Sequence, residues 1–240
     1  MVAKLKSVWK NQISQLAFKA AIFGLLLLWF GYGHSLPAAA ALVVGVMWLY
    51  FKPFFNPVAM LRPFSVFLIL AFWTTTVTFS YIAVVFLAFL FFVILGLKNL
   101  ILVRRKGWRA FLDISLLYLG FLNFFLLDKS SLFFLKWGGF LVVFYLLFGD
   151  LLRTVRAPDD KVGVVGGVLT LIAAELLWVV SWLPIGFLAS ANLMILVSLL
   201  MVDLLAGYFK GKLRQKMIIK DLMVFLVLLA VVLLTSRWTL

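Results

Sequence analysis

Long apolar runs separated by short polar segments make up most of this chain. A helix that crosses a bilayer needs about 20 mainly apolar residues, because the hydrocarbon is about 30 Å thick and each helical residue rises about 1.5 Å. The pattern predicts an all-α fold, a polytopic transmembrane helical bundle that forms a single integral membrane domain over residues 1–240. The predicted spans, about nine, lie near residues 14–32, 37–51, 64–79, 81–98, 109–127, 132–151, 162–181, 184–208 and 220–236.

The region 64–98 is the hardest to divide, because its polar interruption is a short Thr- and Ser-containing stretch at 74–80. One overlong helix here would place the basic residues that follow on the opposite side of the membrane from every other basic loop. We therefore expect two spans, 64–79 and 81–98. The spans 37–51 and 64–79 are short, so shifts of a few residues at their ends are expected.

The composition excludes a soluble globular domain. Hydrophobic residues make up 66% of the chain and charged residues 12%, against about 45–50% and about 25% in ordinary soluble domains. The 26 Phe and 9 Trp residues also exclude a chain too polar to collapse. Cysteine is absent and His34 is the one histidine, so we expect no thiolate or multi-histidine metal site and no cofactor.

The net charge of +14 comes from 22 Lys and Arg residues against 8 Asp and Glu residues. In a membrane protein such an excess collects on cytoplasmic loops and sets the orientation of the helices, so we expect no nucleic-acid partner. With nine spans and the N-terminus inside, every Lys and Arg except Lys129, Lys136 and Arg237 falls on the cytoplasmic side. This distribution predicts a multi-pass protein of a bacterial-type cytoplasmic (inner) membrane with N-in/C-out topology.

Two segments allow alternatives. The basic head, the apolar stretch and the alanine run around the first span resemble a cleavable signal peptide, but Lys19 and the long polar head favour a retained span. Residues 52–63 carry three prolines, which exclude a continuous helix and favour a segment along the cytoplasmic interface. A re-entrant piece that lines a cavity is the alternative for this segment.

Polar side chains deep in a membrane are costly, and each is a candidate functional group. Reflection about the turn at 181–184 places Glu175 level with Asn192, roughly 12 Å inside the outer end at about 1.5 Å per residue. Asn192 and Asp203 lie on nearly the same face of one span. The three residues are our candidates for handling a proton or a ligand. The alternative is that a protonated Glu175 hydrogen-bonds to Asn192 and joins two helices.

The other polar residues suggest pairing and packing. Asp150 is level with Arg109 across the turn at 128–131, which predicts an ion pair at the cytoplasmic end of that hairpin. A run of small residues at helical spacing predicts a face that lets another helix approach closely; its members are Gly163, Gly166, Gly167, Thr170 and Ala174. That helix belongs either to this chain or to another copy.

The chain contains no H-E-x-x-H, G-x-S-x-G or Walker motif, so the sequence predicts no catalytic residues of those classes. We favour a small transporter or carrier-like protein with its site at Glu175, Asn192 and Asp203. The first alternative is a non-catalytic subunit or assembly factor of a membrane complex. The second is a lipid head-group-modifying enzyme that acts near Asp113 and Asp150. Its head-group-binding candidates are Arg104, Arg105, Arg109, Arg153 and Arg156. The expected partners are membrane lipids, with anionic head groups on the cytoplasmic side, and a possible homo-oligomer or membrane complex.

The odd number of spans predicts the location of the C-terminus. A topology reporter fused after Leu240 is expected to behave as extracytoplasmic, because nine crossings from an inside N-terminus end outside. Alkaline phosphatase and green fluorescent protein fusions measure this directly. A cytoplasmic signal would mean that the number of spans is even.

Overall fold

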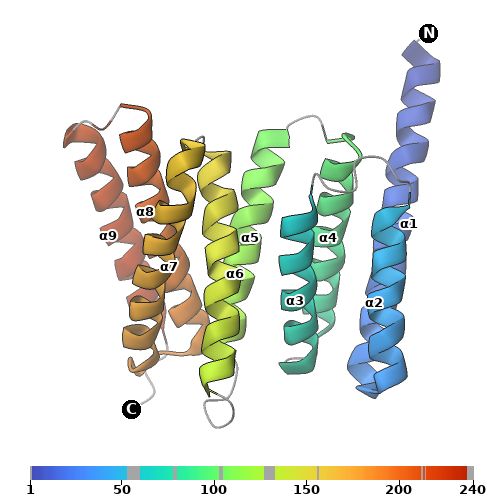
Figure 1. Ribbon diagram of the computed structural model, residues 1–240, viewed down its shortest axis with the longest axis horizontal. Helices are drawn as coiled ribbons and strands as arrows, with labels where there is room; N and C mark the ends of the chain where they lie inside the picture. Colours follow the sequence, from blue (N-terminus) through green and yellow to red (C-terminus); the bar gives the residue numbers. More distant parts are fainter. Residues whose placement is uncertain are drawn as a thin grey trace. The chain divides into compact units, whose positions relative to one another are not determined.

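The chain folds into helices throughout the part that the structure describes. This structure is a computed structural model that describes residues 2–52, 60–77, 80–102, 105–126, 133–155, 157–211, 213 and 215–236, with backbone alone for residues 2–11, 133–136 and 217. Within these ranges there are nine α-helices and no strand (Figure 1). The helices are α1 (Val2–Gly33), α2 (Leu36–Phe51), α3 (Leu61–Val77), α4 (Tyr81–Lys98), α5 (Arg105–Leu126), α6 (Phe133–Thr154), α7 (Asp159–Ser181), α8 (Phe187–Phe209) and α9 (Gln215–Thr235).

The predicted all-α bundle is confirmed, and each predicted span corresponds to one of these helices. Seven of the described helices are long and apolar enough to cross a membrane. The exceptions, α2 and α3, are apolar but have 16 and 17 residues, which reach about 24–26 Å at about 1.5 Å per residue. The N-in/C-out orientation stays a prediction.

The helix boundaries follow from local sequence. The region 64–98 is two helices, as expected, with the extended Ser80 immediately before α4. Pro37 occupies the first turn of α2, where its missing N–H costs no hydrogen bond. α1 begins well before its predicted span, because no glycine or proline precedes Gly24 and the helix extends into the polar head. The predicted interfacial segment at 52–63 lies largely outside the described residues.

The chain divides into two compact units, Met1–Leu112 and Asp113–Leu240. The first turns of α5 belong to the first unit and the rest of α5 belongs to the second. The expectation of a single membrane domain stays a prediction.

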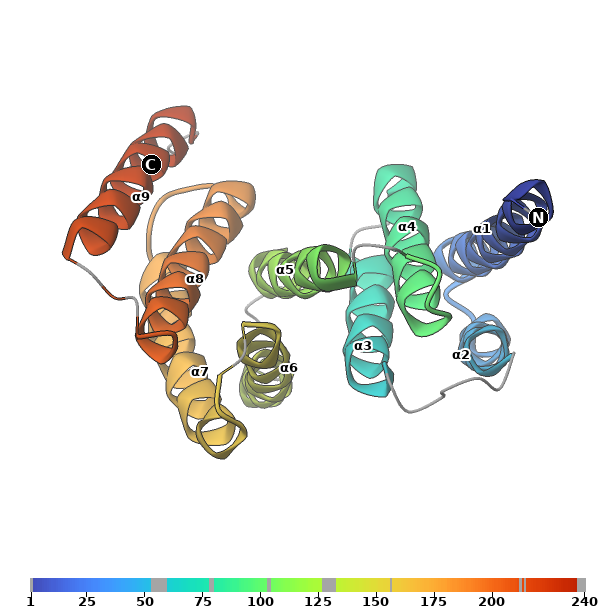
Figure 2. The ribbon, with the colours of Figure 1, turned by 90° about the horizontal axis from the view of Figure 1, so that it is seen from above.

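An aromatic core joins the helices of the first unit, in which α1 packs against α2, α3 and α4 (Figure 2). The ring centroid of Phe23 on α1 lies 5.5 Å from that of Phe67 on α3 and 4.6 Å from that of Phe91 on α4. Tyr50 of α2 stacks on Phe64 of α3 with centroids 3.8 Å apart. All five rings are fully buried, so one cluster holds four helices.

A close glycine contact joins α6 and α7 in the second unit. A Cβ atom added at the buried Gly166 of α7 would lie 3.7 and 3.8 Å from the N and Cα atoms of Gly149 on α6. Of the small residues predicted to form a packing face, Gly166 and Thr170 are buried, Gly167 and Ala174 are half-buried, and Gly163 is exposed. Within that predicted face, Gly166 makes the contact with α6, and the packing role of Gly163, Gly167 and Ala174 stays a prediction.

The α6–α7 contact predicts a position-specific effect of side-chain size. Gly166→Leu is expected to lower the free energy of unfolding by about 1–3 kcal/mol, because its side chain has no room against the Gly149 backbone. Gly167→Leu is the matched control, since nothing lies within 4 Å of a Cβ atom there and both changes raise helix propensity. Unfolding in detergent micelles measures both. Equal losses at the two positions would contradict the close approach at Gly166.

Candidate functional site

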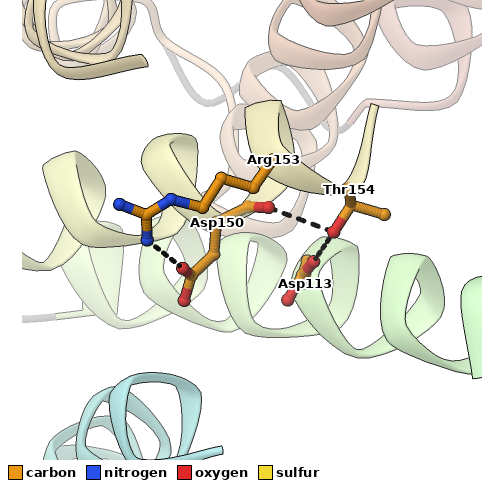
Figure 3. A network of polar contacts seen from close by, with 4 residues as sticks. All are labelled: Asp113, Asp150, Arg153 and Thr154. Carbon is orange, nitrogen blue, oxygen red and sulfur yellow. Dashed lines mark hydrogen bonds and ion pairs between the residues drawn. The ribbon is translucent and has the colours of Figure 1, made fainter. Parts of the chain in front are cut away.

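A network of polar side chains lies between α5 and α6, within the second unit (Figure 3). Two of its members are buried carboxyl groups: Asp113 is 1% exposed and Asp150 is 4% exposed. The Thr154 hydroxyl lies 2.9 Å from Asp113 Oδ2, and a guanidinium nitrogen of Arg153 lies 3.4 Å from Asp150 Oδ1. The network therefore joins a side chain of α5 to the last turn of α6.

Helical spacing builds the α6 half of this network. Asp150, Arg153 and Thr154 are three and four residues apart, so they share one face of the final helical turn. Arg153 also lies where a positive charge interacts favourably with the C-terminal end of the helix dipole. The Thr154 hydroxyl lies 3.0 Å from the Asp150 carbonyl oxygen as well. Because it has a single proton, it donates either to that carbonyl or to the Asp113 carboxylate.

The electrostatic role of the network is to satisfy buried acids. A carboxylate removed from water is costly unless it is hydrogen-bonded or paired. Hydrogen bonds to a charged group contribute about 1.5–3 kcal/mol, more than neutral ones. The Thr154 hydroxyl and the Arg153 guanidinium supply such contacts, and the arrangement holds α5 and α6 together at this end.

The structure brings together part of the set proposed for a head-group enzyme. Asp113, Asp150 and Arg153 meet in the network, and Arg105 is exposed in the first turn of α5. Arg104 and Arg156 lie outside the described residues. Thr154 was absent from the sequence-based candidates, although its position four residues after Asp150 was a readable signal.

The predicted Arg109–Asp150 pair stays a prediction. The ion pair that the described residues show for Asp150 is with Arg153 of its own helix. Arg109 is half-buried one turn before Asp113 on α5, and its Nε atom is buried with no hydrogen-bond partner within the described part of the chain.

The three candidates for proton or ligand handling lie in different surroundings. Glu175 is exposed six residues before the end of α7, Asn192 is half-buried near the start of α8, and Asp203 is exposed near the end of α8. No hydrogen bond among the three occurs in the described ranges. Asp203 instead lies within electrostatic range of Asp221 on α9 and of Lys210. Their joint role stays a prediction.

Nothing in the described ranges forms a metal centre, because no group of three or more His, Asp or Glu side chains comes together there.

The long apolar helices define the class of this chain: it is a multi-pass integral membrane protein. The chain has no significant match among protein-family models, curated proteins or solved structures.

The Thr154–Asp113 contact predicts a specific requirement for a hydroxyl group. Thr154→Val is expected to lower the free energy of unfolding by about 1–3 kcal/mol, because the buried Asp113 carboxylate loses a donor. Thr154→Ser keeps the donor and is expected to retain most of the stability.

A second control is Thr170→Val, since the described hydrogen bond of that buried hydroxyl runs only to the carbonyl of Gly166 on its own helix. Unfolding in detergent compares the three variants. A loss for Thr154→Val no larger than that for Thr154→Ser or Thr170→Val would contradict the assigned role.

Proposed function

We propose that this chain is a non-catalytic subunit of a membrane complex, held to a transmembrane helix of a partner protein through Glu175. The observation that carries the proposal is the exposure of this acidic residue within a long apolar helix, six residues before its end. The membrane is taken to be the cytoplasmic one, as the distribution of basic residues predicts.

Glu175 belongs to the outer face of α7. The large apolar residues at the same helical spacing are strongly exposed: Val164 at 73%, Leu171 at 63% and Trp182 at 74%. The buried side of the helix includes Gly166, where α7 contacts α6. The Glu175 carboxyl therefore points away from the α6 contact.

The energetic cost of this placement supports a partner. An acidic side chain at the centre of a bilayer costs about 2.5–3.5 kcal/mol on insertion scales. Glu175 has no hydrogen-bond or ion-pair partner within the described part of the chain. A hydroxyl, amide or basic group on a neighbouring helix would offset this cost, with a typical gain of about 0.6–2 kcal/mol for a polar contact in a membrane. Apolar residues on the same face need no such partner, because lipid tails cover them as well as a partner helix would.

The second candidate is a carrier function, the one that the sequence alone favoured. The observation that supports it is that α7 packs against α8, which carries Asn192 and Asp203. In a carrier the Glu175 carboxyl would take up and release a proton or a ligand during each cycle. The chain would then act without a partner protein.

Photo-crosslinking in native membranes tests the proposal. A photoreactive residue at Leu171 or Trp178, one turn to either side of Glu175, is expected to give a discrete adduct with a second polypeptide. Val142 of α6, which is 60% exposed, is the matched control and is expected to give none. Glu175→Leu is expected to reduce the adduct about 3- to 30-fold, because the polar contact of about 0.6–2 kcal/mol is lost.

An adduct that survives Glu175→Leu unchanged, or equal adducts at Val142, would contradict the subunit proposal. The carrier alternative has its own readout. The purified chain alone in liposomes would then show proton or solute flux that disappears in Glu175→Gln.

A further inference from the structure

The C-terminal end of α2 has an unusual set of partners. The last carbonyl groups of any helix lack partners inside the helix and need donors from elsewhere. Backbone N–H groups that follow the helix often supply them, and the Lys52 N–H donates to the Trp48 carbonyl in this way. Pro53 has no N–H, so the Leu49 carbonyl lacks its regular donor four residues on. In the described structure, lysine side chains from other helices donate hydrogen bonds to carbonyl groups at this end of α2.

Two amines reach these carbonyls. Lys98, at the end of α4, donates to the Tyr50 carbonyl, and its Nζ atom lies 4.3 Å from the centroid of the Tyr50 ring. Lys19 of α1 donates to the carbonyls of Lys52 and, at 3.5 Å, Leu49. Lys52 follows α2 directly, and its Nζ atom lies 4.4 Å from the Trp48 ring centroid. The "lysine site" is this cluster of Lys19, Lys52 and Lys98.

Positive charge at the lysine site exceeds what the helix end balances. A helix C-terminus carries the equivalent of about half a negative charge, against three ammonium groups. Lys19 is close enough to both Lys52 and Lys98 for electrostatic repulsion. All 8 acidic residues of the chain lie at or after Asp113, so residues 1–112 contain no carboxylate side chain that could neutralise the cluster.

The cluster is also accessible from the surface. Lys98 is 2% exposed, Lys19 is half-buried and Lys52 is exposed, so the amines run from the interior outward. Each ammonium group has three donors, and within the described residues the hydrogen bond of Lys98 to the Tyr50 carbonyl uses one of them. Positive charge without a nearby carboxylate, together with ammonium donors that no described residue accepts from, matches the chemistry of a phosphate group.

We infer that the lysine site binds a phosphate-bearing anion, supplied by the head group of an anionic lipid. The three lysines come from predicted cytoplasmic ends of their spans, where anionic head groups attract Lys and Arg side chains. Trp48 beside Lys52 suits the interface between hydrocarbon and head groups. This site is distinct from Glu175 and does not depend on the proposed function.

Thermal unfolding of the purified full-length chain in detergent tests the inference. Phosphatidylglycerol, phosphatidylcholine and inorganic phosphate are titrated separately, and the unfolding midpoint is followed. We expect phosphatidylglycerol to raise the midpoint of the wild-type chain, with phosphatidylcholine ineffective. The double variant Lys19→Gln/Lys52→Gln is expected to bind phosphatidylglycerol about 25-fold more weakly, since each lysine contributes about fivefold.

Two further variants separate a site from general charge and from misfolding. Lys161→Gln/Lys216→Gln removes the same charge from exposed positions in the second unit and is expected to weaken binding less than about twofold. Lys52→Gln alone leaves the Lys19 and Lys98 hydrogen bonds in place and is expected to weaken binding about fivefold.

Two outcomes support the lysine site and differ in its ligand, and three others overturn it. Protection by inorganic phosphate as strong as that by phosphatidylglycerol, lost in the double variant, supports the site with free phosphate as its ligand. Protection by phosphatidylglycerol alone, lost in the same variant, supports it with the lipid. No protection of the wild-type chain by either anion, equal protection by phosphatidylcholine, or equal weakening in the two double variants would overturn the inference.

Discussion

The satisfaction of backbone polar groups in a medium without water is the constraint on which this structure depends. Within hydrocarbon each unpaired N–H or C=O group costs several kcal/mol, so the spanning segments are helices that pair these groups internally. The threonines follow the same rule: Thr74 and Thr75 donate to carbonyls of their own helix at 2.8 and 2.9 Å. The problem that remains lies at the helix ends. At the end of α2, which precedes Pro53, amines from α1 and α4 donate to the carbonyls of Leu49, Tyr50 and Lys52 and thereby join three helices.

Charge is distributed differently in the two units, and this determines how each treats its polar groups. In the second unit two of the acids have a basic neighbour in the same helix or at its end: Asp150 pairs with Arg153, and Asp203 lies within range of Lys210. The first unit has no acidic residue, so its lysines contact carbonyl groups and aromatic rings instead. A carbonyl carries a partial charge only, which is why a cluster of this kind retains affinity for an anion.

Packing inside the units uses two means that suit a membrane, where apolar burial alone gives little advantage over lipid. Aromatic rings fill the space between helices in the first unit, around Phe23 and Phe91. In the second, Gly149 and Gly166 let two backbones approach closely. Glu175 takes part in neither kind of packing, because it faces outward among exposed apolar residues. This contrast with the satisfied Asp113 and Asp150 makes it the best candidate for contact with another molecule.

The sequence by itself determined the class of fold, the number of helices and most of their limits. The thickness of the bilayer sets how many apolar residues a span needs, so the lengths of the apolar runs and the positions of the prolines locate the helices. Even the doubtful region 64–98 was divided correctly, since charge on its flanks carried the information. Side-chain partners depended on the tertiary structure. Helical rotation decides which side of a helix a residue occupies, and an apolar helix with little periodicity does not reveal it. The close contact at Gly166 rather than Gly167, the outward position of Glu175 and the meeting of Lys19 with Lys98 therefore emerged only when the helices were packed.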